Sequence, residues 1–213
     1  RELLQVSPFP PFMMKALQEA EYTVHDHTHI KDPGALSKVS AIVGTGAAKV
    51  DRKLLMMLPN VKLIAICGVV YDGIDVEAAK EKGIVVTHTP GVLTDDVADL
   101  AMVLLLSIGR RIPQADRFVR NGDWVDDVFP LTHKVSGARL GIVGMGRIGR
   151  AIAKRAAAFD MHISYSCRGA KAEVPYAFYK TATQLAAEVD YLVVAVPGGD
   201  ETKNMIGASV LQA

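Results

Sequence analysis

The segment "LGIVGMGRIGRAIAKRAAAF", residues 140–159, constrains the fold more than any other part of the chain. An apolar run is followed at once by G-x-G-x-x-G, at Gly144, Gly146 and Gly149, and then by helical sequence. Gly144 permits a tight turn, Gly146 lets the backbone approach a pyrophosphate, and Gly149 lets the helix pack closely on the strand. A strand, a glycine turn and a helix in this order begin a Rossmann unit, so the segment predicts a dinucleotide-binding parallel sheet.

Strand-like and helix-like segments alternate on both sides of this motif, which favours two α/β domains with parallel sheets. Strands are expected at 2–7, 22–27, 40–46, 61–68, 84–89, 139–144, 162–167 and 190–196, and helices at 11–20, 51–59, 75–83, 147–159 and 181–189. Further helices are expected to end at Asn121-Gly122 and to include "GASVLQA" at residues 207–213. Pro90 and Gly91 interrupt the pattern. A long apolar helix follows, with Thr94 as its expected N-cap, and we expect it to be buried on most sides and to join the two domains.

The second strand of the glycine-turn unit, in "HISYSCRGAK", ends at the position that selects the dinucleotide. In NAD-binding domains an acidic residue at this position hydrogen-bonds the adenosine ribose. Here Cys167 takes that position and Arg168 follows, supplying a planar cation suited to a 2′-phosphate. Ser166 and Lys171 offer a hydroxyl and a second charge. The strand end favours NADP(H), with an ordinary surface arginine as the alternative.

Composition argues against several classes of function. A net charge of +1 over 213 residues gives no basic field for nucleic acid or anionic membrane. The most apolar run, "LAMVLLLSIG", is shorter than the ~20 residues that a membrane-spanning helix needs. Cys67 and Cys167 lie far apart, so neither a disulfide framework nor a zinc site is expected and a reducing cytoplasm fits. His25, His27 and His29 alternate along a strand, but exposed strand-end residues are favoured over a metal site.

Four blocks of sequence resemble the D-2-hydroxyacid dehydrogenases, specifically their NADPH-dependent glyoxylate/hydroxypyruvate reductases. In chain order they are "GVVYDGIDVEAAKEKGIVVTHTP", "VLTDDVADLAMVLLLSIGRRI", "GIVGMGRIGRAIAKRAAAF" and "DYLVVAVPGGDETKNMI". The resemblance implies a flavodoxin-like substrate-binding domain over residues 1–92. It also implies an NADP-binding Rossmann domain over 93–213, incomplete at its C-terminus.

The resemblance also implies roles for individual residues. The backbone of Val69 and Val70 would bind the substrate carboxylate, and Thr94 would lie near the nicotinamide. Further cofactor contacts are implied for Arg147 and Ile148 at the pyrophosphate, for Arg168 at the 2′-phosphate, and for Val196, Pro197 and Thr202 on the adenosine side. The helical region 94–124 would form a homodimer interface.

Two departures from the family pattern stand out. Val70 replaces a glycine that the family usually has in G-V-G-Y-D, and a β-branched residue restricts the backbone and adds bulk beside the substrate. The family's catalytic arginine, glutamate and histidine correspond to positions beyond Ala213, so no catalytic residue is expected in this chain. We therefore expect the natural protein to be longer and the chain alone to be inactive.

These observations give one leading hypothesis and two alternatives. The leading hypothesis is NADPH-dependent reduction of glyoxylate, hydroxypyruvate or a similar small 2-keto acid. One alternative is a dehydrogenase of the same family for another acid, such as phosphoglycerate or lactate. The other is a non-catalytic NAD(P)-sensing module like the corepressors built on this fold, because fold alone does not fix function.

Overall fold

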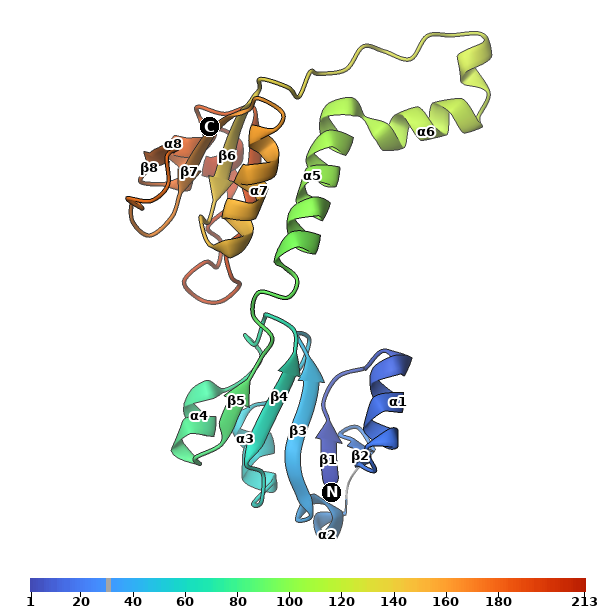
Figure 1. Ribbon diagram of the computed structural model, residues 1–213, viewed down its shortest axis with the longest axis vertical. Coiled ribbons are helices and arrows are strands. Elements are labelled where there is room, and N and C mark those ends of the chain that lie inside the picture. Colours follow the sequence, from blue (N-terminus) through green and yellow to red (C-terminus); the bar gives the residue numbers. More distant parts are fainter. Residues whose placement is uncertain (30–31) are drawn as a thin grey trace. The chain divides into compact units, whose positions relative to one another are not determined.

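A computed structural model describes residues 1–29 and 32–213. The chain forms two compact units, an N-terminal unit of Arg1–Val92 and a C-terminal unit of Leu93–Ala213. Each unit has its own parallel sheet (Figure 1) and its own apolar core.

The N-terminal unit is a five-stranded parallel sheet with helices between its strands (Figure 1). The strand order β2-β1-β3-β4-β5 is that of flavodoxin-like folds, which confirms the expected class. The elements are β1 (Glu2–Gln5), α1 (Pro11–Glu19), β2 (Thr23–Asp26), α2 (Pro33–Leu36), β3 (Val39–Thr45), α3 (Arg52–Met57), β4 (Leu63–Cys67), α4 (Val76–Glu81) and β5 (Val85–Thr87).

Two features of the sequence account for the fold of the N-terminal unit, its apolar strands and the aspartates that cap its helices. Leu4, Ile42 and Ile64, on the three central strands, are fully buried in one cluster, as expected for strands covered on both faces. Asp51 and Asp75 each accept a hydrogen bond at 2.8 Å from a backbone N–H in the first turn of α3 and α4, respectively. These caps fix where the helices begin, after the loops that follow β3 and β4.

The C-terminal unit has a four-stranded parallel sheet in the order β8-β7-β6-β9. In chain order this is the 3-2-1-4 arrangement of the Rossmann fold. The elements are α5 (Thr94–Arg110), α6 (Ile112–Arg120), a 3-10 turn η1 (Asp123–Val125), β6 (Arg139–Val143), α7 (Arg147–Ala157), β7 (His162–Ser166), β8 (Ala177–Tyr179), α8 (Ala182–Ala186), β9 (Tyr191–Val194) and α9 (Ala208–Leu211).

The long helix α5 differs from the expectation in two respects. Its N-cap is Leu93, and Thr94 is its first helical residue with no side-chain cap, so the expected cap was wrong by one position. The helix belongs to the C-terminal unit and buries one face only, through Ala98, Met102 and Leu105. These side chains share a core with α7, whereas Leu100, Val103, Leu104 and Ile108 stay exposed.

Ion pairs also hold α5 against α7. Arg155 Nε lies 2.5 Å from Asp99 Oδ1, and Arg155 Nη2 lies 3.0 Å from Asp95 Oδ1. The hydrogen bonds that Arg155 donates to Asp99 and then to Asp95 raise the pKa of Arg155, which keeps it charged. Among the described residues, no helix combines the length and hydropathy needed to cross a bilayer.

Candidate functional site

The glycine turn follows β6 as the sequence predicts, and each glycine has a distinct steric reason. Gly144 has φ +101°, and a Cβ there would lie 2.5 Å from the Ala195 carbonyl oxygen. A Cβ on Gly149 would collide with the carbonyl oxygen of Gly144, so α7 packs directly on the turn. A Cβ on Gly146 would meet nothing within 4 Å. The open backbone at Gly146 is what a pyrophosphate needs for close approach.

The start of α7 presents unpaired donors beside this opening. The N–H groups of Arg147, Ile148 and Gly149 have no acceptor in the part of the chain that the structure describes. Arg147 is exposed, and Ile148 is half-buried against the core. Free N–H groups and the positive end of the helix dipole together suit an anionic group.

The end of β7 lies against the same turn. The Gly144 N–H donates to the Ser166 carbonyl oxygen at 2.8 Å, which ties the turn to the strand end. Ser166 is buried, Cys167 is half-buried with Sγ 3.0 Å from the Gly169 carbonyl oxygen, and the Arg168 side chain is 97% exposed. Arg168 therefore projects freely from the strand end that follows the glycine turn.

An acidic residue that the sequence analysis did not single out lies beside Arg168. The Nη1 atom of Arg168 is 4.0 Å from Glu201 Oε2, and both side chains are exposed. The Lys171 backbone N–H donates to the buried Tyr165 hydroxyl at 2.8 Å, which fixes the loop after Arg168. The end of β7 is therefore followed by two cations, Arg168 and Lys171, and a carboxylate from the segment after β9 approaches Arg168.

The residues expected on the adenosine side come from the segment after β9. A Cβ on Gly144 would lie 2.9 Å from Val196 Cγ1, so this segment borders the turn directly. The Thr202 hydroxyl donates to the Pro197 carbonyl oxygen at 2.6 Å and closes a short loop. The structure brings the expected residues of the glycine turn, the β7 end and the β9 end together along one edge of the sheet. Thr94 is half-buried at the start of α5.

The expected substrate loop follows β4 in the N-terminal unit. Gly68 has φ +154°; its N–H donates to Thr89 Oγ1 at 3.0 Å, and its carbonyl accepts from the Thr89 N–H at 2.9 Å. His88 Nδ1 lies 3.0 Å from the Val69 carbonyl oxygen. The N–H groups of Val69 and Val70 have no acceptor among the described residues. Successive unpaired N–H groups at a strand end are suited to a carboxylate.

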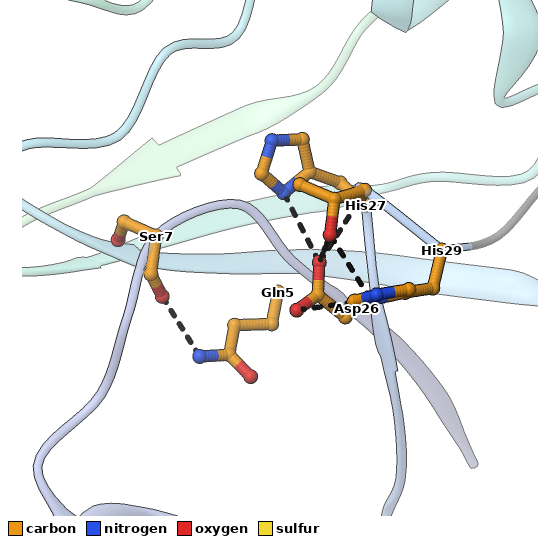
Figure 2. A network of polar contacts seen from close by, with 6 residues as sticks. Gln5, Ser7, Asp26, His27 and His29 are labelled. Carbon is orange, nitrogen blue, oxygen red and sulfur yellow. Dashed lines mark hydrogen bonds and ion pairs between the residues drawn. The ribbon is translucent and has the colours of Figure 1, made fainter.

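The three alternate histidines lie at the end of β2 and contact carboxylates. His25 Nε2 is 2.8 Å from Glu2 Oε2. Figure 2 shows His27 and His29 on either side of Asp26, with closest distances of 3.7 and 3.6 Å, while Gln5 donates to the Ser7 carbonyl oxygen. Hydrogen bonds from Thr28 lower the pKa of Asp26. The described residues contain no group of three ligands that could hold a metal ion.

Two cavities are lined by none of the expected site residues, although the second borders the glycine turn at Met145. One of about 470 Å³ is lined by His27, Lys49, Asp51, Leu54 and Gly73. The other, of about 300 Å³, lies between α7 and residues 173–176. Ligands of open parallel sheets bind outside the carboxyl ends of the strands. The strand ends, rather than these cavities, therefore define the candidate site.

A family model agrees with this geometry. Residues 102–213 match the D-isomer specific 2-hydroxyacid dehydrogenase, NAD binding domain. The chain belongs to this family. The match covers β6, the glycine turn, β7 and β9, the elements that form the candidate dinucleotide site.

Curated proteins that are similar to this chain are named as reductases. A glyoxylate/hydroxypyruvate reductase A of Arabidopsis thaliana is 46% identical over 177 residues, covering 83% of this chain and 56% of the relative. A glyoxylate reductase of Thermococcus litoralis is 45% identical over 184 residues, covering 82% and 56%, respectively. The chain thus spans just over half the length of these relatives.

Solved structures of the family share the fold. The NADPH-dependent glyoxylate/hydroxypyruvate reductase of Sinorhizobium meliloti, in complex with NADP and malonate, matches with a TM-score of 0.89 and 35% identity. The match covers 99% of this chain and 66% of that one. A 2-hydroxyacid dehydrogenase of Ketogulonicigenium vulgare matches with a TM-score of 0.90 and 38% identity, covering 99% and 68%.

Proposed function

We propose that the protein is an NADPH-dependent reductase of small 2-keto acids, with glyoxylate and hydroxypyruvate as its substrates. The observation that carries the proposal is Arg168, which is exposed at the end of β7 beside the glycine turn and directly follows Cys167, the residue at the position where an NAD enzyme has a carboxylate. The names of the reductase relatives support the substrate class. In this proposal residues 1–92 bind the substrate and 93–213 bind NADP(H).

The residues of this chain would bind and orient the reactants. The open backbone at Gly146 and the N–H groups at the start of α7 would hold the pyrophosphate, and Arg168 would hold the 2′-phosphate. The N–H groups of Val69 and Val70 would hold the substrate carboxylate. When bound, the nicotinamide supplies a hydride to the keto carbon and the keto oxygen takes up a proton, giving a 2-hydroxy acid and NADP⁺.

Steady-state kinetics of the whole protein test the proposal. Oxidation of NADPH with glyoxylate or hydroxypyruvate, at a higher kcat/KM than with NADH, is the expected result. NADPH binding without turnover on any 2-keto acid would instead support the NAD(P)-sensing module. A preference for phosphoglycerate or lactate oxidation would support the other dehydrogenase, and equal kcat/KM with both cofactors would reject the NADP assignment.

We also propose that the protein is a homodimer that pairs through α5, α6 and η1. Large apolar side chains on these elements are exposed in the single chain: Leu100, Val103, Leu104, Ile108, Ile112, Val119, Trp124 and Val125. Contiguous apolar patches of a few hundred Å² or more are uncommon on monomers. The patch is built from elements of one unit, which a second copy would cover with the same patch.

A cytoplasmic location completes the proposal. Both cysteines are free, Cys67 exposed and Cys167 half-buried, which suits a reducing compartment. Cell fractionation of the native protein tests it, and recovery in a secreted fraction would reject it.

A further inference from the structure

We propose that His88 is a positioning residue for the substrate carboxylate, because it sets the direction of the Val70 N–H group. The inference rests on the proposed function, in which the N–H groups of Val69 and Val70 bind that carboxylate. It assigns a role to a side chain that the sequence analysis associated with no chemistry.

The loop after β4 has few attachments of its own. Gly68 is held by two hydrogen bonds to Thr89, and Tyr71 accepts a hydrogen bond from the Ile74 N–H at 3.0 Å. Between these two points, the N–H groups of Val69 and Val70 have no acceptor among the described residues. The Val69 carbonyl contacts His88 Nδ1 at 3.0 Å. His88 therefore holds the part of the loop that would meet the substrate.

Because the peptide group is planar, the contact between His88 and the Val69 carbonyl also sets the direction of the Val70 N–H. The Val69 carbonyl and the Val70 N–H belong to the same peptide group, which is planar and trans. In a trans peptide the C=O and N–H bonds point in opposite directions. When His88 fixes the carbonyl on one side, it also fixes the Val70 N–H on the opposite side.

The contact with a carbonyl oxygen determines which nitrogen of the His88 ring carries a hydrogen. A carbonyl oxygen only accepts, so Nδ1 must carry the hydrogen. The ring also packs edge-on against Tyr71, with centroids 4.8 Å apart and an interplanar angle of 69°. His88 is half-buried. Tyr71 follows Val70 directly, so His88 contacts the loop on both sides of the Val70 N–H group.

Two substitutions separate positioning from packing. His88→Leu removes the donor and keeps an apolar side chain of moderate size. His88→Asn keeps an N–H donor at the δ position, so it is the conservative rescue. His162→Leu, at an exposed histidine that begins β7, is the matched control.

The experiment measures the KM for glyoxylate, the Kd of the inert keto-acid analogue oxamate, kcat and the Kd of NADPH in the whole protein. We expect His88→Leu to raise the KM and the oxamate Kd about 3- to 10-fold, the effect of one lost hydrogen bond. The NADPH Kd should stay within about twofold, since the cofactor contacts of the proposal are unchanged. His88→Asn should recover most of the affinity, and His162→Leu should match the unsubstituted protein.

A second measurement keeps the inference separate from the proposed function. Oxamate added to ¹⁵N-labelled protein should shift the Val70 amide resonance, and His88→Leu should reduce that shift at equal oxamate concentration. If the protein reduces no 2-keto acid but this pattern holds, the proposed reaction is rejected and the positioning role stands. If keto acids are reduced and His88→Leu changes neither oxamate affinity nor the Val70 shift, the positioning role is rejected. Equal losses in His88→Leu and His88→Asn would also reject it.

Discussion

Arg168 is the residue on which the cofactor assignment depends. Replacing it with alanine would remove the charge-assisted contact that we propose with the 2′-phosphate, which should weaken NADPH binding by about 1.5–3 kcal/mol. NADH has no such phosphate, so its affinity should not change. Isothermal titration of both cofactors to the Arg168→Ala protein measures the difference.

Lys154→Ala provides a control for that titration, because Lys154 is an exposed cation in the last turn of α7. It should leave both affinities unchanged. If Lys154→Ala weakened NADPH as much as Arg168→Ala, a general electrostatic attraction would explain binding and the specific contact would be rejected.

Alanine substitution should affect fold stability differently at Gly144 and Gly146, although the two glycines are only two residues apart. Alanine at 144 combines a positive φ with a Cβ 2.5 Å from the Ala195 carbonyl oxygen, so it should destabilise the fold by about 2–4 kcal/mol. Alanine at 146 meets nothing within 4 Å, so it should change stability by less than about 1 kcal/mol. It should still weaken dinucleotide binding, because the methyl group fills the space the pyrophosphate needs. Thermal unfolding and cofactor titration distinguish the two, and equal stability of both variants would contradict the steric explanation.

Single residues of the candidate site could be identified from sequence only where a local rule applies. The three glycines follow a backbone rule and have the predicted steric surroundings. Glu201 was not anticipated, because its approach to Arg168 brings together residues 33 positions apart. His88 was missed for the same reason, since its partner is 19 positions earlier. Contacts of this kind depend on strand pairing, which side-chain type does not encode.

At the scale of elements, Asp190 links the starts of β6 and β9. Its carboxylate accepts from the Arg139 side chain at 2.7 Å and from the Arg139 N–H at 2.8 Å. These bonds lower the pKa of Asp190 from 3.8 to about 2. Because the folded pKa lies below the unfolded one, the stabilisation is complete above pH 3.8 and is lost as the pH falls towards 2.

Asp190→Asn should therefore reduce stability near neutral pH and flatten its dependence on pH between about 4 and 2. The side chain is partly exposed, so the loss should not exceed about 1 kcal/mol. Urea unfolding at a series of pH values measures it. An unchanged slope of stability with pH in the variant would show that other carboxylates control the acid response.

Element type was predictable over most of the chain, because buried parallel strands are continuous apolar runs and helices have clear end signals. The elements α2, η1 and β8 were not predicted, and they contain four, three and three residues, too few for a periodic pattern. The extent of burial of α5 was also misjudged, because the helix was expected to be buried on most sides and buries one face only. Nearly every position from Leu100 to Leu106 is apolar, so periodicity cannot choose the face, and packing against α7 does.

At the scale of the whole molecule, the exposed face of α5 predicts the assembly state. Ile108 is 73% exposed in the single chain. Replacing Leu104 and Ile108 together with glutamate would bury charge in the proposed interface, so the dimer should dissociate to monomers. Sedimentation velocity of the whole protein measures the mass.

Met56→Glu is the control for that experiment, because Met56 on α3 is 72% exposed and lies in the other unit. It should leave the dimer intact. A monomeric unsubstituted protein, or a dimer that survives both glutamates, would reject the interface.

The order of strands has a consequence for synthesis. In each sheet the first strand to be made, β1 or β6, lies between two strands that come later in the chain. When β6 has just left the ribosome, this apolar strand is exposed, because its partner β9 lies some fifty residues further along the chain. Unpaired strand edges on a growing chain are prone to aggregation, and parallel pairing over long separations is slow. For β6 this exposure ends only when Tyr191–Val194 emerges from the ribosome, so newly made chains should need chaperone protection most during that interval.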